Sequence, residues 1–419
     1  MAQIYPFHAY RYSAAAGPLE NLLTQPYDKI SPAMQQRYLA ASPHNLVRII
    51  LGEKRESDTA ADSVYTRAAA YFQQWISGGI LVRDSRPVLF PYFQQFQVPD
   101  TGEILTRQGF IGLGAVVDYA ERIVHRHEHT LSGPKKDRLE VLRHTGAHFG
   151  QIFMLYPDRE GALDRILAEE MERRRVCELT DEYGAVHRLG RVDDPARIAE
   201  IQGLMADKKL LIADGHHRYE TALNYRNENP GDPAAGAVMM TFVNMYSPGL
   251  RILGTHRLVH SLGSYTPAAL RAAVEMRFRI KILRGLGDLQ EAWAEPHKGL
   301  IRIGVAGAGE TLLLERPRNG LELDVNVLHD EILHQALGIT PEAVRDEKYI
   351  KYIRGADVAA AEVESGRGQV AFLMEPAPVE HVAEISFNGG VMPQKSTDFY
   401  PKLLTGMAIY RLSDSFPAP

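Results

Sequence analysis

Cysteine and tryptophan are scarce in this chain of 419 residues, which contains one cysteine and two tryptophans. The single cysteine, Cys177, excludes an intrachain disulfide, a zinc site built from thiolates and a paired-cysteine redox motif. A chain without such crosslinks fits a reducing compartment, so we expect a cytoplasmic protein.

Long runs of one residue type are also missing. No stretch reaches the roughly 18 uninterrupted apolar residues of a membrane helix, and the amino terminus shows no charged-then-apolar signal pattern. No block of five or six like charges occurs, and the formal net charge is −5. The composition therefore argues against a nucleic-acid or membrane partner. The composition does not exclude a homo-oligomer.

The residues that are present describe an ordinary globular chain, 45% hydrophobic and 24% charged, long enough for one large or two medium domains. Helical and strand patterns alternate without internal repeats, which predicts a mixed α+β fold. Periodicity breaks near residues 258–266, so we divide the chain into a phosphate-binding lobe over 1–260 and an accessory α/β part over 261–419. The carboxyl-terminal loop of that part is expected to return to the site.

Several elements are predicted by local signals. Ser31 followed by Pro32 is typical of a helix start, as are Thr266-Pro267 and Thr340-Pro341. A helix is expected over 59–79 and an extended segment over 45–51, "NLVRIIL". Alternating patterns predict strands in "PVLFPYFQQFQV", "RQGFIGLGAVVDY", "LIRIGVAG" and "ETLLLE".

The stretch "LLIADGHHRYETALNYR" over 210–226 is the most informative motif. An apolar run, a glycine and a helical pattern predict a strand, a tight turn and a helix start, whose amide groups and dipole favour an anion. Gly215 permits close approach, Arg218 offers a fork for phosphate oxygens, and His216 and His217 can donate to an anion or bind a metal. Asp214 can hold a divalent ion or, in the simpler reading, only cap the helix.

A second polar cluster is "HRHEHTLSGPKKDR" over 125–138. In an extended segment His125, His127 and His129 share one face, which is a spacing that can bind zinc, although a polar strand end gives the same pattern. We favour Glu128 as a general base or a magnesium ligand. The cations that follow it, among them Arg138, suit phosphate contacts or simply a solvated helix entry.

Two further loops carry candidate residues. "MPQKSTDFYPK" over 392–402 combines Lys395, Ser396 and Thr397, a cation with two hydroxyls, which can grip a phosphate or a carboxylate. "QPYDKISP" over 25–32 places Asp28 in a turn before a helix, where it is either catalytic or only turn-forming. The sequence contains no P-loop, dinucleotide-binding fingerprint or nucleophile elbow.

Four of these motifs together resemble one family. "ADGHHRYETAL", "QPYDKIS", "HEHTLSGPKKDRL" and "MPQKSTDFYPKLLTG" occur in the order found in the bacterial and archaeal domain of unknown function 1015. The resemblance runs nearly end to end, and the family name implies no activity.

The Asp-Gly-His-His-Arg turn is also similar to the phosphate-binding turn of the ParB/sulfiredoxin-like fold, which includes free-serine kinases. Sulfiredoxins carry a cysteine where this chain has His216, which argues against sulfinic-acid repair, and ParB clamps have a basic module that this chain lacks. The remaining implication is a small-molecule kinase in a ParB/sulfiredoxin-like, nucleotide-binding lobe.

These inferences predict a phosphotransferase that uses ATP or another nucleotide and Mg²⁺ or Mn²⁺. It would move a phosphoryl group to a hydroxyl of a small metabolite, with a serine-like amino acid as first candidate. Gly215, His216, His217, Arg218 and Lys395 would hold phosphates, and Glu128 and Asp214 would bind metal or act as the base, with His127 as a weaker candidate. The alternatives are a nucleotide-binding regulator and a metal-dependent hydrolase.

Overall fold

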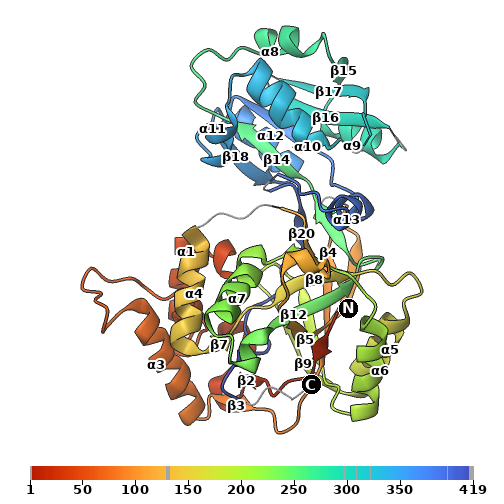
Figure 1. Cartoon of the computed structure of the whole chain (residues 1–419). Helices are drawn as coiled ribbons and strands as arrows, with labels where there is room; N and C mark the ends of the chain where they lie inside the picture. The colour runs from red at the N-terminus through yellow and green to blue at the C-terminus, as the bar shows by residue number, and fades with distance from the viewer. Residues whose placement is uncertain are drawn as a thin grey trace. The chain divides into compact units, whose positions relative to one another are not determined.

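A computed structural model describes residues 2–99, 101–128, 133–295, 299–307, 309–320, 322–393 and 395–414 (Figure 1). The chain forms two compact units. Unit 1 comprises Met1–Arg251, Ser386–Gly390 and Pro401–Pro419, and unit 2 comprises Ile252–Ile385 and Val391–Tyr400. Both units combine helices with sheets, so the mixed α+β prediction is confirmed. The chain first enters unit 2 after Arg251, somewhat earlier than the division expected at residue 260.

Unit 1 is built on a nine-stranded sheet with the order β6-β11-β8-β12-β5-β4-β10-β9, with β1 paired to β5. The strands are β1 (Ile4–Tyr5), β4 (Phe90–Gln97), β5 (Ile104–Ala115), β6 (Val124–Arg126), β8 (Ile152–Tyr156), β9 (Arg175–Thr180), β10 (Val186–Gly190), β11 (Leu210–Asp214) and β12 (Ala237–Asn244). Strands β8 and β12 are buried along their whole length, as expected for central strands covered on both faces.

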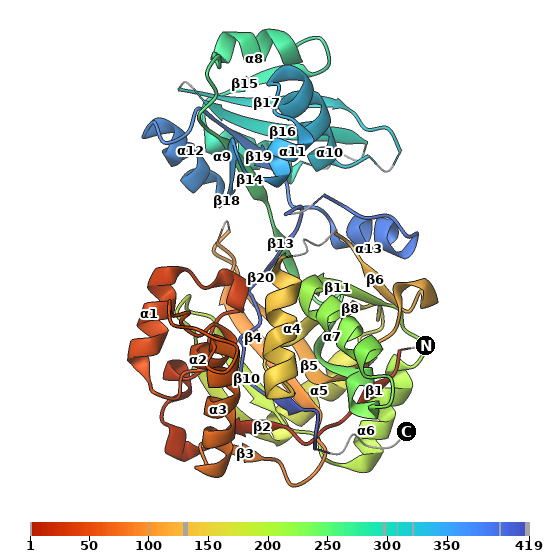
Figure 2. The same cartoon turned by 60° about the vertical axis from the view of Figure 1, so that its left-hand side comes forward.

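Helices cover both faces of this sheet. Helices α4 (Gly133–Thr145) and α7 (His216–Glu228) pack against each other on one face, and α5 (Ala162–Arg173) and α6 (Pro195–Met205) lie together on the other, as the two views in Figures 1 and 2 show. Helix α3 (Val64–Ser77) packs against α4. The core of unit 1 joins residues of the sheet to residues of α5, α6 and α7, with Ile212 and Tyr219 fully buried in it.

Local signals predicted most starts of elements correctly. Ser31 caps α1 (Pro32–Ala41) through its side chain, and Thr266 and Thr340 cap α8 (Pro267–Val274) and α11 (Pro341–Arg345) in the same way. The helix expected from residue 59 begins only at Val64, because Ser63 forms a capping box with Thr66.

The extended segment expected over 45–51 is wrong. Residues Val47–Ile50 form the short helix α2, and Val47 and Ile50 are buried in it. The Asn45 side chain accepts a hydrogen bond from the Val47 amide at 2.9 Å and so starts the turn. A short apolar run that is buried on several sides has the same pattern in a strand and in a helix, so periodicity does not separate the two.

Unit 2 has its own six-stranded sheet with the order β15-β17-β16-β19-β14-β18. The strands are β14 (Thr255–Val259), β15 (Arg279–Leu283), β16 (Leu300–Gly307), β17 (Glu310–Pro317), β18 (Ile350–Arg354) and β19 (Val370–Met374). Besides α8 and α11, its helical segments are α9 (Leu286–Ala294), α10 (Asp324–Val327), the π-helix η6 (Leu328–Ala336), α12 (Ala356–Glu364) and α13 (Val379–Phe387), the last of which ends in residues of unit 1. Strands β16 and β17 confirm the strands predicted in "LIRIGVAG" and "ETLLLE".

The chain returns to unit 1 after unit 2. Strand β21 (Tyr410–Arg411) pairs with β7 (Ala147–His148), and Thr405 pairs with Thr24. This returning segment buries several apolar side chains, namely Leu403, Leu404, Met407, Ala408, Ile409, Tyr410 and Leu412. Unit 1 is therefore completed by residues from the far end of the chain.

Among the described residues, no helix combines the length and the apolar character required to cross a lipid bilayer.

Candidate functional site

Parallel pairing of β6 with β11 brings the two polar clusters of the sequence together. Leu210 lies opposite Val124 and Ile212 lies opposite Arg126, so both strands end at the same edge of the sheet. The residues that follow β6 and the turn that follows β11 therefore meet at that edge. The backbone amide of His127 lies 3.4 Å from Nε2 of His216, which confirms that the 125–138 cluster reaches the Asp214 turn.

The turn has the strand–glycine–helix geometry that the sequence predicts. Gly215 has φ +94°, a left-handed conformation that favours glycine, and α7 begins at the next residue. Gly215 occupies the N-cap position, and no side chain in the described part of the chain caps α7 there. The first amide groups of the helix therefore have no hydrogen bond to an N-cap side chain, and the helix dipole places partial positive charge beside them.

Asp214 is held between two cations. Its Oδ2 accepts a hydrogen bond from Arg218 at 2.6 Å, and its Oδ1 accepts one from Lys402 at 3.3 Å. Burial alone would raise the pKa of this carboxyl, but the charges of Lys402, Arg218 and Lys29 outweigh that effect and hold it far below the usual value. Asp214 is therefore ionised and orients two cations rather than capping the helix.

Arg218 has a second, structural contact, since it also donates to the backbone carbonyl of Gln151. Only 14% of its side chain is exposed, so it does not point into bulk solvent. Lys402 and Lys29 were not singled out from the sequence, although both lie inside quoted motifs, "YPK" and "YDK". Lysines in loops are usually solvated, so the sequence alone does not distinguish these two as residues of the site, whereas the fold does.

His127, Glu128 and His216 form a compact group whose potential ligand atoms all lie within 4.8 Å of one another. Nδ1 of His216 lies 3.5 Å from Oε1 of Glu128. Nδ1 of His127 donates to the carbonyl of Ile212 at 2.7 Å, which leaves the lone pair of that ring on Nε2. Burial lowers the pKa of His216 well below its usual value, so its ring is neutral at neutral pH.

The other histidines of the cluster do not join this group. His125 contacts the carbonyl of Ser386 at 3.1 Å, and His129 lies outside the described residues. His217 is half-buried on α7, and burial lowers its pKa.

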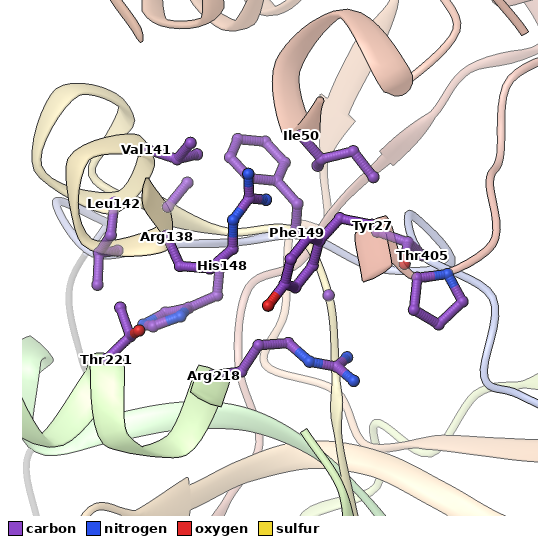
Figure 3. A pocket seen from close by; sticks show the side chains of 13 residues that line it. Tyr27, Ile50, Arg138, Val141, Leu142, His148, Phe149, Arg218, Thr221 and Thr405 are labelled. Atoms are coloured by element: carbon purple, nitrogen blue, oxygen red, sulfur yellow. The ribbon is translucent and has the colours of Figure 1, made fainter. Parts of the chain in front are cut away.

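A small cavity of about 70 Å³ opens beside the turn (Figure 3). Arg218 and Thr221 of α7, Arg138 of α4 and Tyr27 line it, and the guanidinium of Arg138 lies 4.1 Å from the centre of the Tyr27 ring. In Figure 3 the Tyr27 hydroxyl points into the space between Arg138 and Arg218. Asp28, in the 3-10 helix η3 (Tyr27–Lys29), is exposed.

Lys395, Ser396 and Thr397 belong to unit 2. Lys395 is exposed with φ +59°, and the Ser396 hydroxyl donates to the carbonyl of Pro393 at 2.6 Å. Their predicted role in the site of unit 1 stays a prediction.

The family profile described as "protein of unknown function (DUF1015)" matches residues 4–337, so the chain belongs to the DUF1015 family. No curated protein matches the chain in sequence.

Among solved structures, a conserved hypothetical protein from Pyrococcus furiosus is 15% identical with a TM-score of 0.36, over 70% of this chain and 94% of that one. A free serine kinase in complex with AMP is 12% identical with a TM-score of 0.35, over 68% and 89% of the two chains. SbnI from Staphylococcus aureus is 8% identical with a TM-score of 0.35, over 71% and 87%.

Proposed function

We propose that unit 1 binds a nucleotide through its phosphates at the Asp214–Arg218 turn and transfers a phosphoryl group to a hydroxyl of a small metabolite. The observation that carries this proposal is the open amino terminus of α7 directly after β11, with Lys402 and Arg218 held beside it by Asp214. Backbone amides, a helix dipole and fixed cations are the groups that stabilise phosphate charge.

Glu128 is the proposed base. It lies next to His216 at the start of α7, where a hydroxyl attacking a bound phosphate would be found. In the reaction the hydroxyl oxygen forms a bond to phosphorus, the bond from phosphorus to the nucleotide oxygen breaks, and the hydroxyl proton passes to Glu128. A serine-like amino acid remains the first candidate acceptor, on the resemblance of the turn.

Glu128 must stay free of metal to act as the base, and Asp214 does not fit magnesium, so a magnesium ion would be held mainly by the nucleotide phosphates. Both oxygens of Asp214 already accept hydrogen bonds from cations, whereas magnesium usually takes one or two carboxylates together with substrate phosphates. A bound magnesium ion would neutralise charge on the phosphate oxygens.

The test combines binding with turnover. Unfolding temperature is measured with ATP, ADP, AMP and CTP, with and without Mg²⁺; a ligand at 100 times its dissociation constant stabilises by about 2.7 kcal/mol. Phosphorus NMR then follows nucleotide consumption with and without free amino acids. Glu128→Gln should retain binding and lose turnover, while Glu172→Gln on the exposed face of α5 should keep both. Binding without turnover would point to a regulator, and no binding would end the proposal.

A metal-dependent hydrolase is the second candidate, because His127, Glu128 and His216 offer two imidazoles and one carboxylate. The 3.5 Å between His216 and Glu128 is close to the separation of about 3.3 Å expected for ligands on one tetrahedral zinc ion. Elemental analysis after dialysis against zinc, and hydrolysis that stops with a chelator and needs no nucleotide, would support this alternative.

A further inference from the structure

Arg257 of unit 2 is a buried arginine in an unusual place. It lies in the middle of β14, and only 1% of it is exposed. Leu258, the next residue, packs into the apolar core with Leu289 and Leu313. Side chains alternate along a strand, so Arg257 points to the opposite face, where its guanidinium lies 5.3 Å from the ring of the paired Tyr352.

No carboxylate in the described part of the chain forms an ion pair with Arg257. Its two terminal nitrogens donate to the backbone carbonyls of Thr255 and Lys395, and its Nε has no partner among the described residues. The other deeply buried arginine of this unit, Arg302, is instead paired with Glu375 at 2.9 Å. Burying a charge without a partner is costly. A buried arginine that has no counter-ion is therefore unusual unless another group compensates its charge.

The cation stays charged despite its burial. Burial lowers the pKa of Arg257 to about 10, so the guanidinium is protonated at neutral pH. A buried charge that has no counter-ion within the described chain is a candidate binding site for an anion from solution.

Arg257 lines a cavity of about 810 Å³ within unit 2. Trp293 of α9 and His381 of α13 line the same cavity, and each has a buried ring nitrogen without a partner among the described residues. Met392 and Ser396 line it too, so the loop that the sequence singled out as an anion grip lies beside Arg257. The volume is in the range of small-molecule sites.

We propose that this cavity binds a small metabolite through a carboxylate that pairs with Arg257. The planar guanidinium matches a carboxylate in a fork geometry, and the indole N–H of Trp293 can only donate, so the ligand must offer acceptors. Exposed Glu295, Glu380 and Glu384 also line the cavity, together with Asp324 and Glu375, which are paired with Arg318 and Arg302. They disfavour a doubly charged phosphate and favour a ligand whose remainder is neutral or cationic.

The carboxylate takes the place of the Lys395 carbonyl. That contact, at 3.2 Å, is at the long end of the normal range for a hydrogen bond, and Lys395 is held in a left-handed conformation that non-glycine residues rarely adopt. Moving this carbonyl aside exposes the guanidinium to the cavity. The proposal rests on unit 2 alone and is independent of phosphoryl transfer in unit 1.

Tryptophan emission tests this directly, because the chain has only two tryptophans, Trp75 and Trp293. Trp75→Phe leaves Trp293 as the sole reporter in the full-length protein. It is titrated with acetate, succinate, L-alanine and inorganic phosphate at constant ionic strength set with chloride. We expect a saturable change with at least one carboxylate.

Substitutions at Arg257 test whether the change in Trp293 emission comes from a ligand bound to Arg257. Arg257→Lys keeps a positive charge and a donor but loses the fork, and should weaken carboxylate binding about ten- to a hundredfold. Arg279→Met removes the same charge from an exposed position on β15 and should change nothing. Arg257→Met should abolish the signal, and circular dichroism shows whether that variant folds.

Three results would overturn the proposal. They are no saturable change with any carboxylate, a change that survives Arg257→Lys at full affinity, and a response to phosphate alone. The second would place the ligand elsewhere, and the third would replace the carboxylate with a different anion.

Discussion

At the scale of single residues, charge placement explains the site better than residue type does. Asp214 was expected to hold a metal or act as a base, yet it accepts from Arg218 and Lys402 and so fixes two cations near the start of α7. The sequence could identify Asp214 and Arg218 because they flank a glycine turn. It could not identify Lys402, since 188 positions separate it from Asp214 and only tertiary folding joins them.

Removal of Lys402 should therefore weaken unit 1. Folding depresses the pKa of Asp214, so the ionised carboxylate stabilises the protein above its unfolded pKa and this stability is lost as the pH falls through the acid range. Lys402→Met should lower the free energy of unfolding at pH 7 by about 1–3 kcal/mol and make its decline below pH 4 shallower. Urea titrations at pH 7 and pH 3 measure both effects. Lys54→Met, at an exposed position, serves as the control, and equal losses in both variants would contradict the prediction.

His256 gives unit 2 a different pH dependence. Burial, helped by the charge of Arg257, lowers its pKa to about 4, and its Nδ1 accepts from the Met374 amide at 3.1 Å. The neutral ring favours folding above the unfolded pKa of about 6.5, and the unfolded state gains protons first as the pH falls towards 4. At pH 5 the cost is about 2 kcal/mol. His256→Asn keeps an acceptor for the amide and should remove this pH dependence, measured by unfolding of Trp293 at pH 7.5 and pH 5. An unchanged slope would rule out His256 as its source.

At the scale of elements, the strand–turn–helix at 210–226 was predicted because each of its parts has a local cause. An apolar run favours a strand, glycine permits the positive φ, and the charged pattern that follows favours a surface helix. The pairing of β6 with β11 was not predictable in this way, because nothing local in the sequence specifies which strands become neighbours. The cost of desolvation favoured this pairing, because it is lower when two polar clusters share one solvated cleft than when each is buried separately.

Gly215 is the residue of this element that should tolerate change least. A Cβ there would lie 3.0 Å from Nε of Arg218, which is fixed by Asp214, and φ +94° strains any side chain. Gly215→Ala should destabilise unit 1 by about 1–3 kcal/mol. Gly203→Ala in α6 meets no atom within 4 Å and should stabilise by about 0.5–1 kcal/mol. Thermal unfolding of both variants distinguishes strain at the turn from a general effect of the methyl group. Similar shifts of the unfolding temperature in the two variants would refute the prediction of strain at Gly215.

At the scale of the whole molecule, the return of the carboxyl-terminal segment to unit 1 affects the candidate site more than the exact boundary between the two units does. The sequence suggested two parts and a carboxyl-terminal return, because the motif at 392–406 does not have the composition of a mobile tail. It singled out Lys395 for the site, whereas the residue that pairs with Asp214 is Lys402 of the same motif. Both lysines sit near prolines, and sequence pattern gave no reason to separate them.

Ending the chain after Tyr400 tests this path. The truncation removes Lys402, β21 and several large buried apolar side chains, each worth about 1.5–3 kcal/mol, which together are comparable to a typical stability of about 5–15 kcal/mol. We expect loss of the unfolding transition reported by Trp75 in α3 and retention of the one reported by Trp293. A chain ending at Asp414 should keep both. A truncated protein with an intact Trp75 transition would show that the returning segment is dispensable.

The returning segment also has a consequence for synthesis on the ribosome. Chains emerge from the amino terminus at about 5–20 residues per second and domains fold as they appear. The sheet edge that carries Asp214 emerges well before Lys402, and all of unit 2 is made in between. Until residue 402 leaves the exit tunnel, the nascent chain has neither the second cation beside Asp214 nor the apolar side chains that close the core of unit 1. A half-made chain therefore exposes apolar surface of unit 1 until the returning segment has been synthesised, so unit 1 cannot complete its core while unit 2 is being made.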